Sequence, residues 1–325
     1  MTPTDVHNHV IPAEAVDLLN TEPVYGARVV DGMWQGVHHV PFEVTESFLE
    51  PAAKIAELDR EGIGAAVVSP PPPLFFYEVS PGGGERLCEA TNEGMQRFCA
   101  HDPQRLRWLA SLPMQDPGLA VRCYLRALDA GCCGAAIGTS IAGRRLDAGE
   151  YEPFWDAAER AGRPVLLHPA FNEQHAALEG WYLQNVIGNP LETTVVVERL
   201  ICAGVLERHP GLRLIILHGG GYVPYQIGRL RHARRVRAEL AGAPEDVTAS
   251  LRQLYFDTIT HDLEALRFLA RRVGVDHVVL GTDLPFDMAM RAPIDALAEA
   301  FGEETVRRIA EENPAVLFGL AAVPG

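Results

Sequence analysis

The sequence predicts an α/β protein built on a (β/α)8 TIM barrel, and three observations support this fold class. Short apolar runs alternate with stretches of helical periodicity along most of the chain, which is typical of repeated strand–helix units. Eight such runs can be placed, which is the number of strands that closes this barrel. With 325 residues, 47% of them hydrophobic, the chain is long enough for one barrel with a small insertion. We therefore expect a single domain over residues 1–325.

Each predicted strand is a short apolar run that ends near a polar residue, a proline or a glycine. We expect strands near Thr4–His9, Ala65–Pro70, Leu106–Pro113, Gly134–Ser140, Pro164–Pro169, Leu212–Gly219, Leu254–Asp257 and His277–Asp283. The amphipathic stretches between and after them predict helices over Glu50–Glu61, Gly84–His101, Gly118–Ala130, Tyr151–Ala161, Pro190–His209, Val223–Glu239, Leu263–Val273 and Pro293–Phe301. Residues 302–320 are expected to add a C-terminal helical tail.

Two segments interrupt the alternation of strands and helices. Residues 20–49 show no clear helical period and lie between the first strand and the first helix, so we expect a small insertion that caps the barrel mouth. Four consecutive prolines at 70–73 exclude a continuing strand or helix and predict a stiff, extended loop. The aromatic residues that end this loop, including Phe76, are expected either to line the substrate pocket or to pack the insertion against the barrel.

Composition and charge exclude several classes of partner. The net charge of −15 is dispersed along the chain, which argues against binding to nucleic acid or to an anionic membrane. No apolar segment is long enough to span a bilayer. The N-terminus has no signal-peptide layout, so a cytoplasmic protein is expected. The six cysteines form no CxxC pair and are interpreted as reduced, mostly buried thiols.

Residues that can bind a metal stand at the ends of the predicted strands, in chain order. His7 and His9 share one face of the first strand because side chains alternate along a strand. His168, His218 and Asp283 end later strands at the carboxyl-terminal rim, where such barrels keep their chemistry. A lone histidine at a strand end is more often a hydrogen-bonded core residue, and it is the ordered set that indicates a metal centre.

We expect the first coordination shell to consist of His7, His9, His168 and Asp283, while Asp5 orients one of these ligands from behind. Imidazole and carboxylate ligands with room for water suit Zn²⁺, with Mn²⁺ as the alternative. The only lysine, Lys54, lies in an amphipathic stretch and is interpreted as part of a solvated helix face. No lysine is therefore available on the fourth strand to bridge two ions, and we expect one divalent metal per chain unless a carboxylate bridges two.

His218 is the histidine most suited to proton transfer. The three glycines that follow it allow backbone to approach the pocket closely, and an imidazole near metal-bound water exchanges protons readily near neutral pH. The alternative role for His218 is a fourth nitrogen ligand. Asp257 is expected at the rim and Asp262 as a helix N-cap. His38 and His39 lie in the insertion and are left open as pocket residues, whereas the remaining histidines are interpreted as structural: His101, His175, His209, His232 and His277.

Two stretches in the second half of the chain carry a specific pattern, His218-Gly219-Gly220-Gly221 continuing to Tyr225, and Gly281-Thr282-Asp283 continuing to Phe286. With Asp5-x-His7-x-His9, His168-Pro169 and Pro190-Leu191-Glu192-Thr193-Thr194, they resemble the amidohydrolase-related decarboxylases over nearly the whole chain. The resemblance implies zinc-dependent, non-oxidative decarboxylation, with His7, His9, His168 and Asp283 as ligands and His218 as the catalytic histidine. From their places at the rim, we expect His218 and Asp283 together to act as catalytic residues that handle the proton. The resemblance also implies that Arg229 binds substrate carboxylate across a homodimer interface and that Trp181 lines the substrate pocket.

The chain departs from this family's pattern around the substrate. No arginine in Trp34–Phe42 matches the family's second carboxylate-binding arginine. Ala170, Asn185 and Leu284 stand where the family has larger aromatic residues. The metal site is thus retained while the pocket is altered.

These observations predict a metal-dependent decarboxylase that acts on a small unsaturated or aromatic carboxylic acid. The alternative enzyme is a metal-dependent hydrolase or hydratase of a lactone, a cyclic amide or an enol acid. A non-enzymatic metal-holding protein on the same barrel is the third hypothesis, against which the intact His218 argues.

Overall fold

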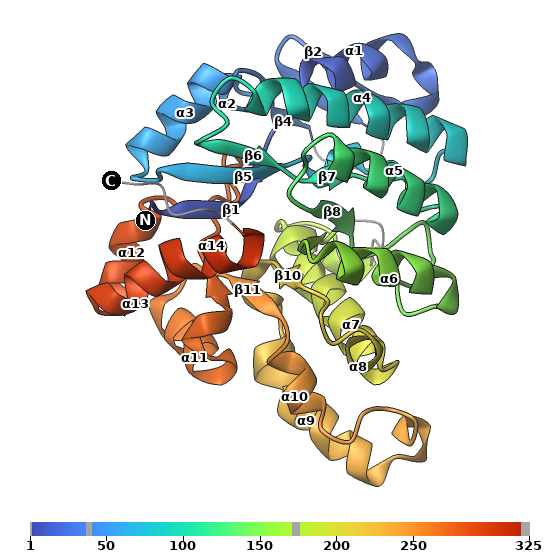
Figure 1. Ribbon diagram of the computed structural model, residues 1–325, viewed down its shortest axis with the longest axis vertical. Coiled ribbons are helices and arrows are strands. Elements are labelled where there is room, and N and C mark those ends of the chain that lie inside the picture. Colours follow the sequence, from blue (N-terminus) through green and yellow to red (C-terminus); the bar gives the residue numbers. More distant parts are fainter. Residues whose placement is uncertain (1, 37–40, 171–175, 320–325) are drawn as a thin grey trace.

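The computed structural model describes residues 2–36, 41–170 and 176–319, and it contains the predicted barrel (Figure 1). A parallel sheet of three strands follows the order β1-β5-β6, and a second sheet follows the order β12-β11-β10-β9-β8-β7. The strands are β1 (Thr4–His9), β5 (Ala65–Ser69), β6 (Leu106–Trp108), β7 (Ala110–Ser111), β8 (Ala135–Gly138), β9 (Val165–His168), β10 (Leu214–Ile216), β11 (Tyr255–Asp257) and β12 (Val278–Val279). All eight predicted strands are present, and the third is divided between β6 and β7.

Backbone hydrogen bonds join the two sheets into a closed barrel. Between β6 and β7, Leu109 donates to the carbonyl of Val68 on one side while Ala110 donates to that of Gly134 on the other. At the opposite seam, β1 pairs with the segment that continues β12, through Val6 N–H to Leu280 and His9 N–H to Leu284. The first and last strands of the chain are therefore neighbours.

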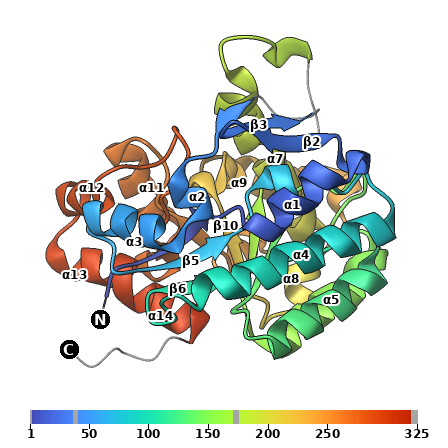
Figure 2. The same ribbon diagram turned by 90° about the horizontal axis from the view of Figure 1, so that it is seen from above.

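Helices surround the strands, as Figures 1 and 2 show. The outer helices are α3 (Pro51–Arg60), α4 (Pro81–Cys99), α5 (Pro117–Asp129), α6 (Glu152–Ala161), α7 (Asn189–Cys202), α8 (Val205–Arg208), α9 (Val223–Val236), α10 (Val247–Leu251), α11 (Leu263–Val273) and α12 (Pro293–Ala300). The prediction of one continuous helix over Pro190–His209 is wrong, because two helices occupy this range. Gly204 has a left-handed backbone (φ 68°) that ends α7 and begins α8. Asp262 caps α11 as predicted, accepting a hydrogen bond from Ala265 N–H.

The insertion forms a small layer of its own. An antiparallel sheet of β2 (Ala27–Val30), β3 (Met33–Gly36) and β4 (Phe42–Glu43) lies between α1 (Ala13–Thr21) and α2 (Glu46–Leu49). Helix α1 and this sheet were not expected. Their apolar side chains form a separate cluster that includes Trp34 and Phe48, both fully buried. Strands this short cannot be recognised from their sequence pattern, and packing in this cluster stabilises them.

The prediction of a fully extended proline-rich loop is wrong, because Pro72–Leu74 forms a turn of 3₁₀ helix. Its end packs against the insertion, where the rings of Phe76 and Tyr25 meet edge to face with centroids 5.5 Å apart. Phe76 belongs to the same apolar cluster as Trp34.

One cluster of buried residues contains a side chain from almost every barrel strand: Val6, Val67, Leu109, Ala136, Leu166, Ile215 and Val279. It also includes Leu317 and Phe318 of α14 (Asn313–Phe318), which with α13 (Glu303–Arg307) forms the predicted C-terminal tail. Leu166 precedes His168 by two residues on the same strand face, so this cluster lies on the amino-terminal side of the predicted ligands.

Lys54 is completely buried on α3, and its predicted place on a solvated helix face is wrong. Its ammonium group lies 3.0 Å from a carboxylate oxygen of Glu57, one turn further along the helix. Burial lowers the pKa of Lys54 to about 8, against the opposing effect of Glu57. The hydrophobic periodicity of α3 is the same whether Lys54 is exposed at the edge of the apolar face or buried and paired with Glu57. The sequence therefore does not distinguish the two.

Within the ranges described, no helix combines the length and the hydropathy needed to cross a membrane. The six cysteines are free thiols, five of them buried, in agreement with the sequence-based interpretation.

Candidate metal centre

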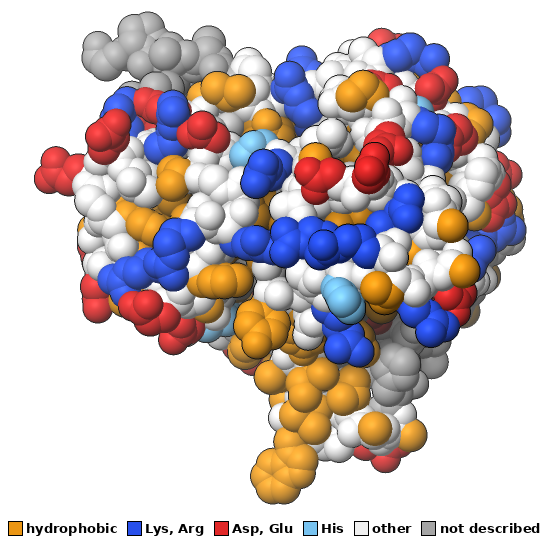
Figure 3. All heavy atoms as spheres, turned by 90° about the horizontal axis from the view of Figure 1, so that it is seen from below, with side chains coloured by type: hydrophobic (Ala, Val, Ile, Leu, Met, Phe, Trp, Pro, Cys, Tyr) orange, Lys and Arg blue, Asp and Glu red, His pale blue; other side chains and the backbone are white. Residues whose placement is uncertain are grey.

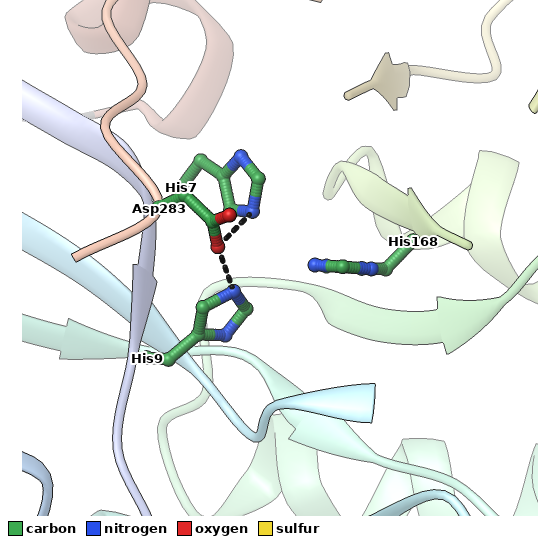
Figure 4. A group of neighbouring side chains, drawn as sticks. All are labelled: His7, His9, His168 and Asp283. Atoms are coloured by element: carbon green, nitrogen blue, oxygen red, sulfur yellow. Dashed lines mark ion pairs between the residues drawn. The ribbon is translucent and has the colours of Figure 1, made fainter. Parts of the chain in front are cut away.

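The four predicted metal ligands converge at the carboxyl-terminal end of the barrel (Figure 4). His7 and His9 extend from β1, His168 ends β9 across the barrel, and Asp283 follows β12. One ligand atom from each lies within 4.8 Å of the other three. Asp283 Oδ1 lies 3.3 Å from His7 Nε2 and 3.0 Å from His9 Nε2. Together these residues form a metal-binding site.

The hydrogen bonds of the three imidazoles fit a bound cation. Each outer nitrogen has an oxygen partner: His7 Nδ1 lies 2.8 Å from Asp257 Oδ2, His9 Nδ1 lies 3.2 Å from Ser69 Oγ, and His168 Nδ1 lies 2.9 Å from the Pro169 carbonyl. The inner Nε2 atoms are buried: those of His7 and His9 face Asp283 Oδ1, and that of His168 has no hydrogen-bond partner among the described residues. Metal-ligating histidines show this arrangement because the outer contact sets the tautomer and leaves the inner lone pair free.

The charges of the cluster are strongly coupled. Burial opposes protonation of His7, but the Asp283 and Asp257 carboxylates outweigh it and raise the pKa of His7 to about 10. Burial lowers the pKa of His9 to about 4 and that of His168 well below its ordinary value. Burial also disfavours ionised Asp283, yet the nearby His7 holds its pKa well below the usual range. Burial and the neighbouring charges therefore favour a protonated His7 beside an ionised Asp283, and neutral imidazoles at His9 and His168.

Two carboxylates hold His7 from behind, Asp5 through its backbone and Asp257 through its ring. Asp5 is fully buried and accepts hydrogen bonds from the backbone of His7 and from the backbone and hydroxyl of Thr282. Asp257 ends β11 and contacts the ring of His7. The sequence analysis predicted that Asp257 lies at the rim but did not assign it this role. Its position directly after Tyr255-Phe256 at the end of a strand was the feature that could have indicated it.

His218 lies beside the four ligands. Its Nε2 is 3.8 Å from Asp283 Oδ2, and its ring centroid lies 5.4 Å from that of His7 and 5.5 Å from that of His168. Its backbone is left-handed (φ 55°), as is that of the following Gly219 (φ 62°). Such a conformation is costly for a non-glycine residue and is concentrated at functional sites.

A cavity of about 670 Å³ opens beside His218 and Asp283, and its wall is mainly apolar. It is bounded by Asn185, Val186, Asn189, Pro190, Gly219, Gly221, Pro224, Tyr225, Ile259, Thr260, His261, Glu264, Ala265, Phe268, Leu269 and Met288. None of these lining residues is a lysine or an arginine. Sequence analysis did not predict the lining residues from the loop after β11 and from α11, because no local pattern indicates that this stretch faces His218.

The structure of this single chain does not bring the predicted substrate-binding residues to that cavity. Arg229 is exposed on α9 and has no ion-pair partner within the described ranges. Trp181 is 91% exposed on a projecting segment, and Phe76 packs in the insertion. Among the substituted pocket positions, Asn185 does line the cavity, whereas Ala170 and Leu284 are buried elsewhere. His38, His39 and His175 lie outside the described residues.

Comparison with known proteins establishes the class to which this barrel and its metal site belong. A model of the amidohydrolase family matches residues 4–320, and the chain belongs to that family. It is 29% identical over 335 residues to the 2-amino-3-carboxymuconate-6-semialdehyde decarboxylase of Dictyostelium discoideum, covering 97% of this chain and 91% of the relative.

Solved structures share the fold at lower identity. The 5-carboxyvanillate decarboxylase of Sphingomonas paucimobilis superposes with a TM-score of 0.84 at 21% identity, covering 98% of this chain and 99% of the other. The dihydroxybenzoic acid decarboxylase of Polaromonas sp. JS666, solved with manganese and the inhibitor 2-nitroresorcinol, gives 0.79 at 21% identity over 99% and 98%. These structures thus share the barrel fold with the present chain, whose metal-binding group is the cluster of His7, His9, His168 and Asp283.

The purified protein is expected to bind one divalent ion per chain, because the ligand atoms form one cluster and the only lysine is paired with Glu57 away from the fourth strand. Elemental analysis after reconstitution measures the ratio. A His168→Ala variant should lose the ion, whereas His232→Ala, on the exposed part of α9, should retain it. Two ions per wild-type chain, or none, would contradict a mononuclear site.

Metal binding is expected to release about one proton near pH 6. His7, with its pKa raised to about 10, must lose a proton to bind, while His9 and His168 are already neutral and Asp283 is already ionised. The apparent affinity should therefore rise about tenfold per pH unit between about pH 4, where His9 takes up a proton, and about pH 7. Calorimetric titration with Zn²⁺ in two buffers of different ionisation enthalpy counts the protons, and pH 6 lies below the range, about 7, where zinc-bound water ionises. Release of no proton would show that His7 is neutral in the free protein.

Proposed function

We propose that this chain is a metal-dependent, non-oxidative decarboxylase of a small unsaturated or aromatic carboxylic acid. The observation that carries the proposal is the position of His218, beside three imidazoles and a carboxylate and on the wall of a largely apolar cavity. The relatives named above are decarboxylases of acids of this kind, which supports the same reaction here.

The residues provide what the reaction needs. In the overall change, a carboxylate and a proton become CO2 and a new C–H bond. A bound divalent metal supplies positive charge that attracts substrate oxygens and stabilises developing negative charge. His218 has an imidazole at the cavity wall from which a proton can reach the carbon that loses CO2, and the Asp283 carboxylate, 3.8 Å from His218 Nε2, favours the protonated imidazole that donates it.

The cavity suits a substrate with one carboxylate. Its lining has no lysine or arginine from this chain, and Asn185, Asn189 and Thr260 offer neutral polar groups. The metal, and Arg229 of the partner subunit in the dimer proposed below, would serve the carboxylate that leaves as CO2. A second carboxylate would be buried there without a partner, at considerable cost. We therefore expect a monocarboxylate whose remaining polar groups are neutral.

We propose Zn²⁺ as the physiological ion and Mn²⁺ as the alternative. Three nitrogen ligands and one carboxylate suit Zn²⁺, while the manganese in the Polaromonas structure supports Mn²⁺. A cytoplasmic location is also proposed, since six unpaired cysteine thiols are typical of a reducing compartment.

A homodimer is proposed as the active form. Hydrophobic side chains gather on a projecting part of the molecule (Figure 3), and the segment that carries Trp181, Tyr182, Val186 and Ile187 leaves all four exposed. Such a patch is typical of an interface. Arg229 would then serve a carboxylate in the partner's cavity, with the planar fork that suits this group, and Trp181 would be covered by the partner.

The function is tested with the metal-loaded enzyme and a panel of substituted benzoates and unsaturated acids, by measuring CO2 release and product mass. His218→Ala should retain the metal and lose about 10²-fold or more of kcat, as expected for a proton-transfer residue; His232→Ala is the matched control. Conversion without CO2 release would identify a hydrolase or hydratase instead. Loss of metal in step with activity would make His218 a ligand.

Arg229→Ala is expected to raise KM by roughly 30-fold, about 2 kcal/mol, since it removes a charge-assisted contact to the substrate. Metal content should not change, and Arg231→Ala on the same helix is the control. If Arg229 acts across the interface, mixing Arg229→Ala with His218→Ala subunits should restore activity, because each mixed dimer regains one complete site. A monomer by light scattering, or no restoration, would contradict a role across the interface, and an unchanged KM would place Arg229 outside the reaction.

A further inference from the structure

Asp257 contacts two functional parts of the site at once. It ends β11, is fully buried, and is not one of the metal-binding group. Its Oδ2 lies 2.8 Å from His7 Nδ1. Its Oδ1 accepts hydrogen bonds from the backbone N–H groups of Gly219, at 2.7 Å, and Ile259, at 3.2 Å. Each oxygen of one carboxylate therefore serves a different element.

The contact with His7 determines how that imidazole meets a cation. A carboxylate oxygen accepts a hydrogen bond, so Nδ1 carries a proton, and Nε2 is the nitrogen that faces Asp283 and the other ligands and would offer its lone pair to a bound cation. The same contact fixes the plane of the ring. Glycine at position 281 allows Asp257 and His7 to approach each other, because a Cβ there would lie 2.8 Å from Asp257 Cβ and 2.9 Å from His7 Cβ.

The contact with Gly219 holds the turn that carries His218. Both residues have positive φ angles, 55° at His218 and 62° at Gly219, and a strained turn of this kind persists only where its surroundings hold it. Gly219 is packed as well, since a Cβ there would lie 2.9 Å from the methyl group of Thr260. The N–H of Gly219 is the backbone donor next to His218, and its acceptor is the carboxylate that orients His7.

We propose that Asp257 is a positioning residue that couples the metal to proton transfer, by holding His7 for the ion and His218 for the substrate through its two oxygens. The part of the proposal that concerns His218 rests on the proposed decarboxylase function, whereas the part that concerns His7 does not. A purely structural role, in which Asp257 only satisfies buried N–H groups, predicts different results.

Asp257→Asn separates the two roles while changing the side-chain volume little. Its amide has one accepting oxygen and one donating nitrogen, so it cannot accept from both His7 Nδ1–H and Gly219 N–H. We expect the affinity for Zn²⁺, measured by competition with a chelator, to fall 10- to 100-fold. The visible spectrum of the Co²⁺-loaded variant should change, and kcat at saturating metal should still fall about tenfold or more because the His218 turn is no longer held.

Asp262→Asn is the matched control, since Asp262 lies five residues further on, is exposed, and caps α11 without touching the cavity. It should leave affinity, spectrum and kcat unchanged. Unchanged Zn²⁺ affinity and an unchanged Co²⁺ spectrum in Asp257→Asn would overturn the role toward His7. A kcat that returns to the wild-type value at saturating metal would overturn the coupling to His218.

If Asp257→Asn does not fold, the wild-type zinc enzyme labelled with ¹⁵N-histidine provides the decisive measurement. The proposal requires a His7 Nδ1–H proton that resonates far downfield and exchanges slowly, as expected for a buried bond to a carboxylate. Rapid exchange of that proton would overturn the proposal. The affinity, the spectra and this resonance do not depend on turnover, so their outcome is distinct from a failure of the decarboxylase assignment.

Discussion

The backbone of His7 accepts hydrogen bonds from Thr282 and Asp283, 3.3 and 2.8 Å long, and these bonds join the two ends of the chain at the metal site. Asp5 strengthens the seam by accepting from the N–H and hydroxyl of Thr282. Only because β1 and the continuation of β12 are neighbours can Asp283 lie beside His7 and His9. The other ligand, His168, then needs only the barrel's own curvature to face them from β9.

The site concentrates charge and strain in a region from which water is largely excluded. Asp283, like His218, has a positive φ, 67°, and its carboxylate lies among imidazoles that are almost completely buried. Buried groups of this kind are costly unless they are paired or bound to a cation. The raised pKa of His7 favours a proton there that offsets the Asp283 and Asp257 carboxylates, and a bound divalent ion would supply a larger positive charge to the same cluster.

The wall of the cavity differs in character from the metal cluster. The ligands come from strands, whose backbone hydrogen bonds fix them, whereas the cavity is formed by the turn after β10, the start of α11 and the segment before α7. Loops and helix termini tolerate substitution more readily than barrel strands do. This difference explains how the metal ligands can be retained beside altered cavity positions such as Asn185. It also explains why family membership indicates the type of reaction more firmly than the identity of the substrate.

Sequence alone determined the barrel, the order of its strands and the four metal ligands, because strand periodicity and the polar residue that ends each strand are local properties of the chain. It also indicated His218, through the glycines that follow it. The antiparallel insertion, the burial of Lys54 against Glu57, the break at Gly204 and the role of Asp257 were decided by tertiary structure. Each depends on contacts between residues far apart in the chain: Asp257 and His7 are separated by 250 positions, and no local pattern distinguishes a carboxylate at the rim from one that holds a ligand. The exposed positions of Arg229 and Trp181 are likewise set by how the helices and the projecting segment pack, which periodicity does not specify.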